Sequence, residues 1–316
     1  MASAMTVLGP VTADRLGRTL MHEHVLVGFA GVQYDSCLPE PDRATLIETC
    51  TAQWVEIKEL GFQTVVDTTP ADLSRDADLL AEVSRRSGVN IVCATGLYSR
   101  LPVPYFNHYG TDAIAEFFIK EITDGIGGTG VKPGIIKCAT SHNQITAYEE
   151  KVLRAAARAH RATGAPITTH TEEGTMGPEQ VAVFESEGVD LRRVIIGHSN
   201  DNTDLRYQSA ILDRGANVGF DRFGYEMHTA DRFQVATLVG VLAMGFVTQV
   251  VLSHDKNCAY LGRAMAPPPP HGERLANWNY THLTRDILPG LLAAGVSQRQ
   301  IDTMLIDNPR RILAGA

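Results

Sequence analysis

Six side chains whose types can bind a metal ion or carry a proton each stand at or near the end of a short apolar segment. They are His22, His24, Lys137, His170, His198 and Asp255. Imidazole nitrogens and carboxylate oxygens are the ligands that zinc, manganese, iron and cobalt take in proteins. Burying four imidazoles, a carboxylate and an amine together costs free energy unless something pairs them. If the fold gathers these residues, a pair of divalent metal ions would compensate their burial.

Lys137 needs a separate argument because a protonated amine cannot ligate a metal ion. Burial favours the neutral amine. A neutral amine can add carbon dioxide to become a carbamate, an anion with two oxygens that can bridge two ions. Carboxylation of Lys137 is therefore a hypothesis that follows from placing this residue inside a metal site.

The segments that must position these residues are short β-rich apolar runs that alternate with longer helical patterns. The predicted strands are 18–27, 64–69, 90–98, 134–140, 165–171, 193–199, 216–224 and 249–255. The predicted helices include 44–60, followed by Gly61 as a C-cap, 147–163 and 178–187. This alternation predicts an α/β fold with a parallel sheet, and eight strands favour closure into a single (β/α)8 TIM barrel. A doubly wound sheet is the alternative.

A barrel brings the C-terminal ends of its strands into one cleft, so we expect the six residues to meet there. His22 and His24 are two residues apart on one strand and should point to the same face. By the same alternation His254 should point away from the barrel interior. Other histidines, among them His160 and His282, are expected at the surface or in loops.

Composition excludes several classes of protein. The chain has 316 residues, of which 44% are hydrophobic and 20% charged, and its formal charge is 28 − 36 = −8. We expect one domain over 1–316, no nucleic acid partner and no attraction to an anionic membrane. No signal peptide pattern and no run of about 18 apolar residues is visible, which predicts a cytoplasmic protein without a membrane span. The five widely spaced cysteines are expected to be reduced.

The six residues and their order resemble the metal site of the phosphotriesterase family of the amidohydrolase superfamily. The resemblance runs from MHEH at 21–24 to DNPRR at 307–311, through FESEGV (184–189), IGHSNDNTDL (196–205) and SHD (253–255). It implies that His22, His24 and Asp255 hold a buried ion and that His170 and His198 hold an exposed one. Carboxylated Lys137 and a hydroxide would bridge the two ions, for which zinc is the first choice and cobalt, manganese or iron the others.

Two further residues resemble the phosphotriesterase-like lactonase branch of that family. They are Tyr98, in TGLYSR, and Arg222, in GFDRFG. In that branch the tyrosine hydroxyl reaches the bridging hydroxide and the arginine borders the ligand pocket. The segment 259–277, with Pro267–Pro270, matches no branch, and we expect it to be a long surface loop at the mouth of the barrel.

The resemblance implies a hydrolase that opens lactones, such as N-acyl-homoserine or γ/δ-lactones, with phosphotriester hydrolysis as a side reaction. Asp255 would accept the proton of the attacking hydroxide. The alternative is a carboxyl ester, amide or organophosphate triester hydrolase of the same family. A barrel that binds metal or ligand without turnover is a third hypothesis, disfavoured because a storage site does not need Lys137 beside Asp255. A homodimer is the expected assembly.

Overall fold

The computed structural model describes residues 2–39, 41–98, 102–263 and 272–315. Within them, parallel strands follow one another in chain order around a ring, each hydrogen-bonded to the next. The ring strands are β3 (Arg18–Val27), β4 (Phe62–Asp67), β5 (Asn90–Gly96), β6 (Ile135–Thr140), β7 (Ile167–Thr171), β8 (Val194–Ile196), β9 (Asn217–Phe220) and β10 (Val250–Leu252). Each overlaps one of the eight predicted strands, and the expected TIM barrel is confirmed.

The ring closes between its last and first strands through the segment that follows β10. The Asp255 N–H donates to the His22 carbonyl over 3.0 Å, and the His24 N–H donates to the Lys256 carbonyl over 2.9 Å. Beyond this segment the chain forms β11 (Asn257–Tyr260), which pairs with β3 in parallel. The sequence predicted a loop from residue 259, so β11 is a correction. The prolines 267–270 lie outside the described residues.

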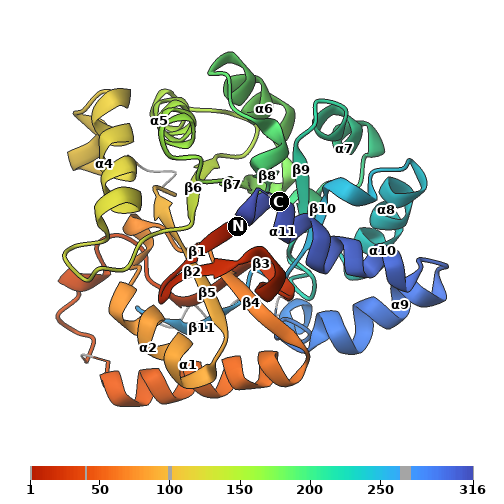
Figure 1. The fold of residues 1–316 in the computed structure, drawn as a ribbon, viewed down its shortest axis with the longest axis horizontal. Coiled ribbons are helices and arrows are strands. Elements are labelled where there is room, and N and C mark those ends of the chain that lie inside the picture. Colours follow the sequence, from red (N-terminus) through yellow and green to blue (C-terminus); the bar gives the residue numbers. More distant parts are fainter. Residues whose placement is uncertain (1, 40, 99–101, 264–271, 316) are drawn as a thin grey trace.

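Helices surround the strands, as Figure 1 shows. The helices that follow β3 to β9 are α1 (Arg43–Glu59), α2 (Ala77–Ser87), α3 (Pro104–Asn107), α4 (Thr111–Asp124), α5 (Ala147–Thr163), α6 (Gly177–Ser186), α7 (Leu205–Leu212) and α8 (Asp231–Ala243). The chain ends in α9 (Leu288–Ala293), α10 (Gln298–Asp302) and α11 (Asn308–Ala314). The predicted helices match α1, α5 and α6. No described helix has both the length and the apolar character needed to cross a membrane.

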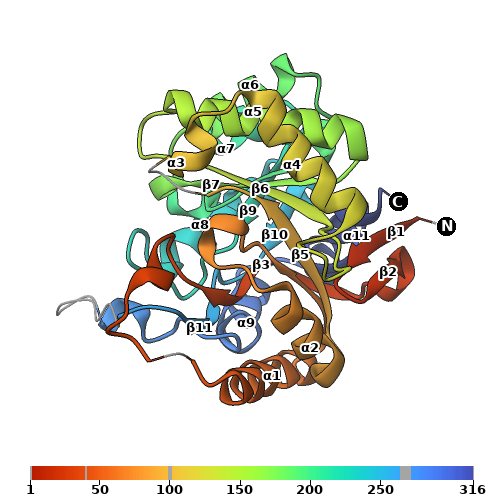
Figure 2. The ribbon, with the colours of Figure 1, turned by 90° about the vertical axis from the view of Figure 1, so that its left-hand side faces the viewer.

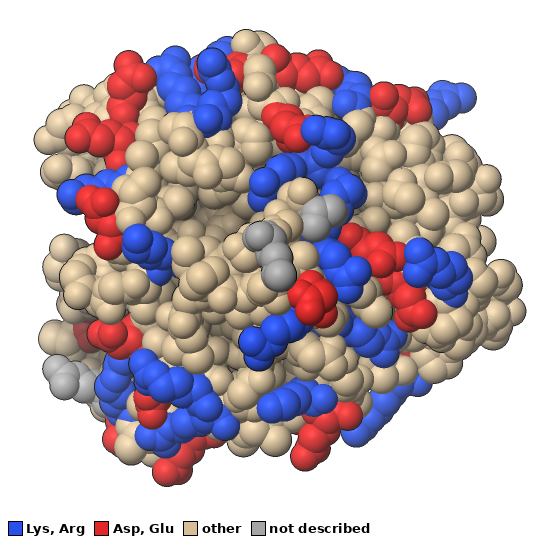
Figure 3. All heavy atoms as spheres, viewed as in Figure 1, with Lys and Arg blue, Asp and Glu red and all other residues tan. Residues whose placement is uncertain are grey.

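A hairpin of β1 (Ser3–Thr6) and β2 (Gly9–Thr12), which the sequence reading missed, precedes the barrel. It lies at the N-terminal ends of the strands, where the Val7 N–H donates to the Ile91 carbonyl. Figure 2 shows the two chain termini at this end and β11 toward the other. Basic and acidic side chains are interspersed on the face that carries the termini, as Figure 3 shows.

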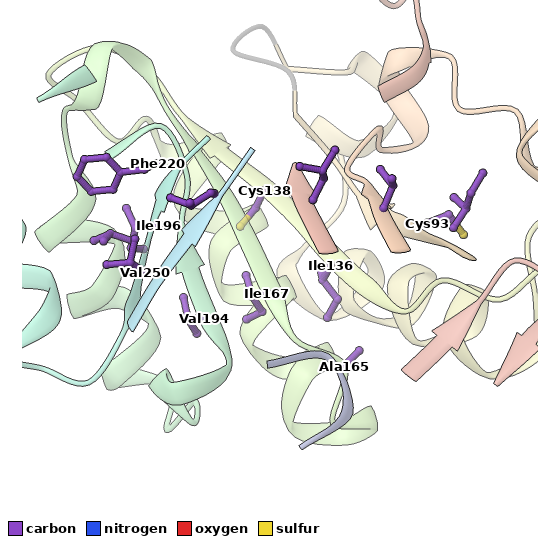
Figure 4. Close-up of a cluster of buried hydrophobic side chains, with 14 of the residues drawn as sticks. Cys93, Ile136, Cys138, Ala165, Ile167, Val194, Ile196, Phe220 and Val250 are labelled. Atoms are coloured by element: carbon purple, nitrogen blue, oxygen red, sulfur yellow. The ribbon is translucent and has the colours of Figure 1, made fainter. Parts of the chain in front are cut away.

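Apolar side chains divide between the two faces of the strands. A large outer cluster packs strands against helices, and Figure 4 shows part of it, including Ile136, Cys138, Ile196 and Phe220. A smaller cluster contains residues of opposite parity from β3, β4, β5, β6, β8 and β10, together with residues of β1 and α11. Since side chains alternate along a strand, this smaller cluster fills the lower interior of the barrel. Polar residues occupy the interior above it.

Candidate metal centre

The aim of His22 and His24 depends on an irregularity in β3. Leu20 pairs with Val65 and Glu23 with Asp67, so β3 has one residue more than β4 over this stretch. Such a β-bulge turns the following side chains to the other face. Leu20 accordingly belongs to the outer cluster, whereas His22 and His24 line the cavity inside the barrel. The two histidines share a face as expected, but the bulge determines which face it is.

Lys137 and His170 follow simple strand alternation. Lys137 lies on β6 between Ile136 and Cys138, which both pack in the outer cluster, and its own side chain is 1% exposed in the interior. His170 lies on β7 at the position paired with Ala139. Both side chains line the same cavity as His22.

His198 and Asp255 lie beyond the ends of β8 and β10, where the backbone adopts the left-handed conformation. Their φ angles are 57° and 54°. Residues other than glycine rarely adopt this conformation, and it is frequent at functional sites. Ile196 on β8 faces outward, so regular alternation would also send His198 outward. The left-handed turn directs it into the cavity instead.

The six predicted residues meet in one cluster. Lys137 Nζ lies 2.9 Å from His22 Nε2, and His24 Nε2 lies 3.0 Å from Asp255 Oδ1. Asp255 is also 3.5 Å from His22 Nε2 and 3.7 Å from His198 Nε2. The ring of His170 is 4.6 Å from that of His198, centroid to centroid. One ligand atom each from His22, His198 and Asp255 lie within 4.8 Å of one another, a set of nitrogen and oxygen donors that fits a divalent cation.

The sequence analysis did not identify Asp221, which binds two of these histidines through the ring nitrogen that faces away from the cluster. Its Oδ2 lies 2.9 Å from His22 Nδ1, and its Oδ1 lies 2.9 Å from His198 Nδ1. An ionised carboxylate can only accept, so both Nδ1 atoms carry the proton and both Nε2 atoms keep a free lone pair for the centre. The sequence offered a sign of this role, because Asp221 is an acidic residue at the C-terminal end of a ring strand, β9, directly before Arg222.

The other two histidines, His24 and His170, also form a hydrogen bond through one ring nitrogen. His24 Nδ1 lies 2.7 Å from the Thr69 hydroxyl, and His170 Nε2 lies 2.8 Å from Glu172 Oε2. Metal-binding histidines in proteins almost always bond their second ring nitrogen to such a partner, which fixes the tautomer and the ring orientation. The chain therefore supplies this support to all four histidines among the predicted ligands.

Burial governs the protonation of the cluster. It lowers the pKa of Lys137 to about 8 and that of His170 to about 3, and it lowers the pKa of His22 and that of His198. Neutral amines and imidazoles have the lone pairs that a carbamate or a metal bond requires. Burial alone would raise the pKa of Asp255, but the charged guanidinium of Arg222, which donates to Oδ2, holds that pKa well below its usual range. Asp255 therefore stays ionised.

Arg222 and Tyr98 border the cluster as the sequence suggested. Arg222 Nε donates to Asp255 Oδ2 over 2.9 Å, and its Nη1 donates to Asp201 Oδ2 over 2.7 Å. Tyr98 packs edge-on against His170, with ring centroids 4.9 Å apart, and its backbone N–H donates to Asp72. Both side chains line the cavity.

The cavity over the cluster has a volume of about 530 Å³, which is within the usual range for small-molecule sites. Its floor is the polar cluster. Its wall carries apolar and aromatic side chains, namely Val27, Phe29, Leu73, Tyr225, Tyr260 and Trp278. The arrangement suits a ligand that has a polar reacting group and an apolar remainder.

Three other histidines can be compared with their predictions. His254 points away from the cavity as expected, and its Nδ1 lies 2.7 Å from Glu23 Oε1. The expectation of surface or loop positions was wrong for His160 and His282, which are both buried. His160 bonds the Ala165 carbonyl at the end of α5, and His282 lies between two aspartates.

Comparisons with known proteins agree with this geometry. The model of the phosphotriesterase family matches residues 2–313. A Mycobacterium tuberculosis protein named phosphotriesterase homology protein is 38% identical over 97% of this chain and 96% of its own length. The aryldialkylphosphatase of Saccharolobus solfataricus is 31% identical over 96% of this chain and 97% of its own length. A solved mutant of a Deinococcus radiodurans PTE-like lactonase superposes with a TM-score of 0.95, at 38% identity, over 98% of this chain and 99% of that one.

Proposed function

Because the chain belongs to the phosphotriesterase family of hydrolases, we propose that it is a metal-dependent hydrolase that opens lactones and acts weakly on phosphotriesters. Members of this family are binuclear metal enzymes. We propose that residues 1–316 form one hydrolase domain. The observation that carries the proposal is the orientation of four histidines, each hydrogen-bonded through its second ring nitrogen and lining one cavity with Asp255.

We assign the ligands by the burial and neighbours of each side chain. His22, His24 and Asp255 would hold the more buried ion, and His170 and His198 the more exposed one. Lys137, buried between them with a pKa of about 8, would bridge the ions after its amine nitrogen bonds the carbon of carbon dioxide and releases a proton. Zinc is the first candidate, and cobalt, manganese or iron the others. When bound, the two ions would lower the pKa of a water molecule and polarise the substrate oxygen.

Carboxylation of Lys137 has a direct test in native mass spectrometry of the intact protein in bicarbonate buffer. We expect a mass increase of one carboxylate over the mass of the sequence, and its loss in the Lys137→Met variant. A native mass without the added group, together with unmodified Lys137 in a crystal structure, would contradict this assignment.

Asp255 would accept the proton that the attacking water loses and pass it toward the leaving alkoxide. It suits this role because it is ionised and touches the cluster through both oxygens. Arg222 would hold it in place, since its guanidinium is itself fixed by Asp201. Tyr98 and Arg222 would border the reacting group of the substrate. In a lactone the leaving oxygen stays attached to the acyl chain, so the product is a hydroxy acid.

The side chains that line the cavity favour a lactone or ester with an apolar substituent. Its wall presents Leu73, Phe29 and Trp278, on which an alkyl or acyl chain can pack. The name of the Saccharolobus relative makes organophosphate triesters the main alternative, with carboxyl esters and amides beside them.

The test is proton release by metal-replete protein on a panel of N-acyl-homoserine lactones, plain γ- and δ-lactones, aryl esters and one phosphotriester. We expect a kcat/KM of about 10⁴ M⁻¹s⁻¹ or above on at least one lactone. Asp255→Asn should lose activity by about 100-fold or more while it keeps much of its metal. Turnover of triesters or esters, but of no lactone, would support the proposed metal-dependent hydrolysis and contradict the proposal that lactones are the substrates. Unchanged turnover in Asp255→Asn would overturn the proton-acceptor role.

The cytoplasmic location and the homodimer expected from the sequence stay predictions. Analytical ultracentrifugation of the metal-replete protein tests the second.

A further inference from the structure

Lys256 is a cation on the cavity wall whose backbone is fixed on every side. It directly follows Asp255 and lines the same cavity. Its N–H donates to Glu23 Oε2 over 2.8 Å. Its carbonyl accepts from the His24 N–H and from the Tyr280 hydroxyl. The side chain therefore leaves a rigid backbone beside the cluster.

The ammonium of Lys256 makes few contacts of its own. It donates to the Asn257 carbonyl over 2.7 Å and lies 4.5 Å from the centroid of the Trp278 ring. That ring is held in turn, because Trp278 Nε1 donates to the His254 carbonyl over 2.9 Å. An ammonium has three N–H donors. The contacts within the described residues use one of them, with partial compensation of the charge by the ring.

No aspartate or glutamate among the described residues forms an ion pair with Lys256. The other cationic side chains of the cavity have such partners or are buried in the cluster. Arg222 bonds Asp255 and Asp201, and Lys137 lies against His22. Among the described residues that line the cavity, Lys256 is thus the cation that has no acidic ion-pair partner and still has unused N–H donors.

We propose that Lys256 determines specificity by binding a carboxylate on the non-reacting part of the substrate. The inference rests on the proposed function for the reacting end of that substrate. A carboxylate beside Lys256 would accept its free N–H groups in charge-assisted hydrogen bonds. It would also neutralise a half-buried charge that Trp278 compensates only in part. The substrate would then be a lactone or ester of an acid that carries a second, unreacted carboxylate.

Binding is measured apart from turnover. The ligands are two cyclopentanones that mimic a lactone and cannot be hydrolysed, with side chains of equal length ending in a carboxylate or in its carboxamide. Isothermal titration calorimetry gives the ratio of the two dissociation constants for metal-replete native protein, Lys256→Met, Lys256→Arg and the exposed-site control Lys120→Met. We expect native protein and the control to favour the carboxylate about tenfold, as a hydrogen bond to a charged group implies. The ratio should fall to about one in Lys256→Met and recover in part in Lys256→Arg.

A ratio near one in native protein, or a ratio that Lys256→Met leaves unchanged, would overturn the inference. Because the measure is a ratio within one protein, a general loss of stability in a variant does not imitate the effect. Turnover of the matched γ-lactones is then measured separately. A carboxylate preference in binding with no hydrolysis of either lactone would support Lys256 as the anion site and overturn the lactonase proposal. Hydrolysis of both with no binding preference would do the reverse.

Discussion

At the scale of single residues, the carboxylate of Asp221 is the contact on which the cluster most depends. Its two oxygens accept from His22 and His198, and the His198 N–H donates to Oδ1 as well. Burial would raise the pKa of Asp221, but His22 in particular holds the pKa below its usual value. An ionised carboxylate at this place orients one ligand proposed for each ion.

Asp221→Asn should weaken metal binding. The amide has one accepting oxygen, so it can satisfy only one of the two Nδ1–H groups and presents N–H donors to the other. We expect a loss of metal affinity of about 10- to 100-fold, the size typical of such supporting contacts. The measurement is competition with a chelating dye, with the exposed Asp213→Asn as control. Equal affinity in Asp221→Asn and native protein would show that the carboxylate does not orient the ligands.

At the scale of elements, the loop between β9 and α8 carries Arg222 and is tied to the C-terminal part of the chain. The Gly224 N–H donates to Asp231 Oδ1 at the start of α8. Asp231 Oδ2 lies 2.6 Å from His282 Nε2, and Asp286 in the π-helical turn Leu283–Ile287 lies 2.9 Å from His282 Nδ1. His282, hydrogen-bonded through both ring nitrogens to two aspartates, thus connects the start of α8 with the π-helical turn.

This contact makes stability depend on pH. Burial lowers the pKa of His282, but Asp231 and Asp286 outweigh burial and raise the pKa above its ordinary value of 6.5. The added stability is fully present below the pKa of the unfolded chain and is lost as pH rises through the higher folded pKa. We expect His282→Gln to lower the free energy of unfolding by about 1–2 kcal/mol at about pH 6 and by less at about pH 9.

Urea denaturation of native protein and His282→Gln at both pH values measures this difference. The exposed His108→Gln should show no such dependence and serves as the control. An effect of His282→Gln that is equal at the two pH values, or larger at the higher one, would contradict the charged pair.

At the scale of the whole molecule, the barrel interior has an apolar lower part and a polar upper part. The lower cluster includes Val66, Ile135 and Ile195, and residues of β1 and α11 join it. The upper part holds buried imidazoles, Lys137 and Asp255. Burying such groups without a metal costs free energy, so bound ions should stabilise the entire fold.

Removal of metal by a chelator should therefore lower the melting temperature. A metal held at 1,000 times its dissociation constant stabilises the folded chain by about 4 kcal/mol. We expect a fall of about 5 °C or more, reversed by zinc or cobalt. Differential scanning calorimetry measures it, and Asp221→Asn should show a smaller shift. Identical melting before and after verified removal of metal would mean that the cluster folds without needing an ion.

The sequence by itself determined the residue types at the strand ends and the alternation of strands with helices. Those patterns sufficed for the barrel and for the set of candidate ligands, because the C-terminal ends of parallel strands must meet at one end of a barrel. They could not give the direction of every side chain. His22 faces inward because of a bulge, and His198 because of a left-handed turn beyond β8.

Only the tertiary structure decided the contacts between residues far apart in the chain. Asp221 binds His22, which is 199 positions away in the chain, and His198, which is 23 positions away. Lys256 lies against the ring of Trp278 on the cavity wall. The hairpin of β1 and β2 and the strand β11 are likewise stabilised by partners elsewhere in the fold rather than by strong local patterns. Local sequence patterns report propensity and periodicity. The pairing of buried polar groups depends on distances in space, which closure of the barrel sets.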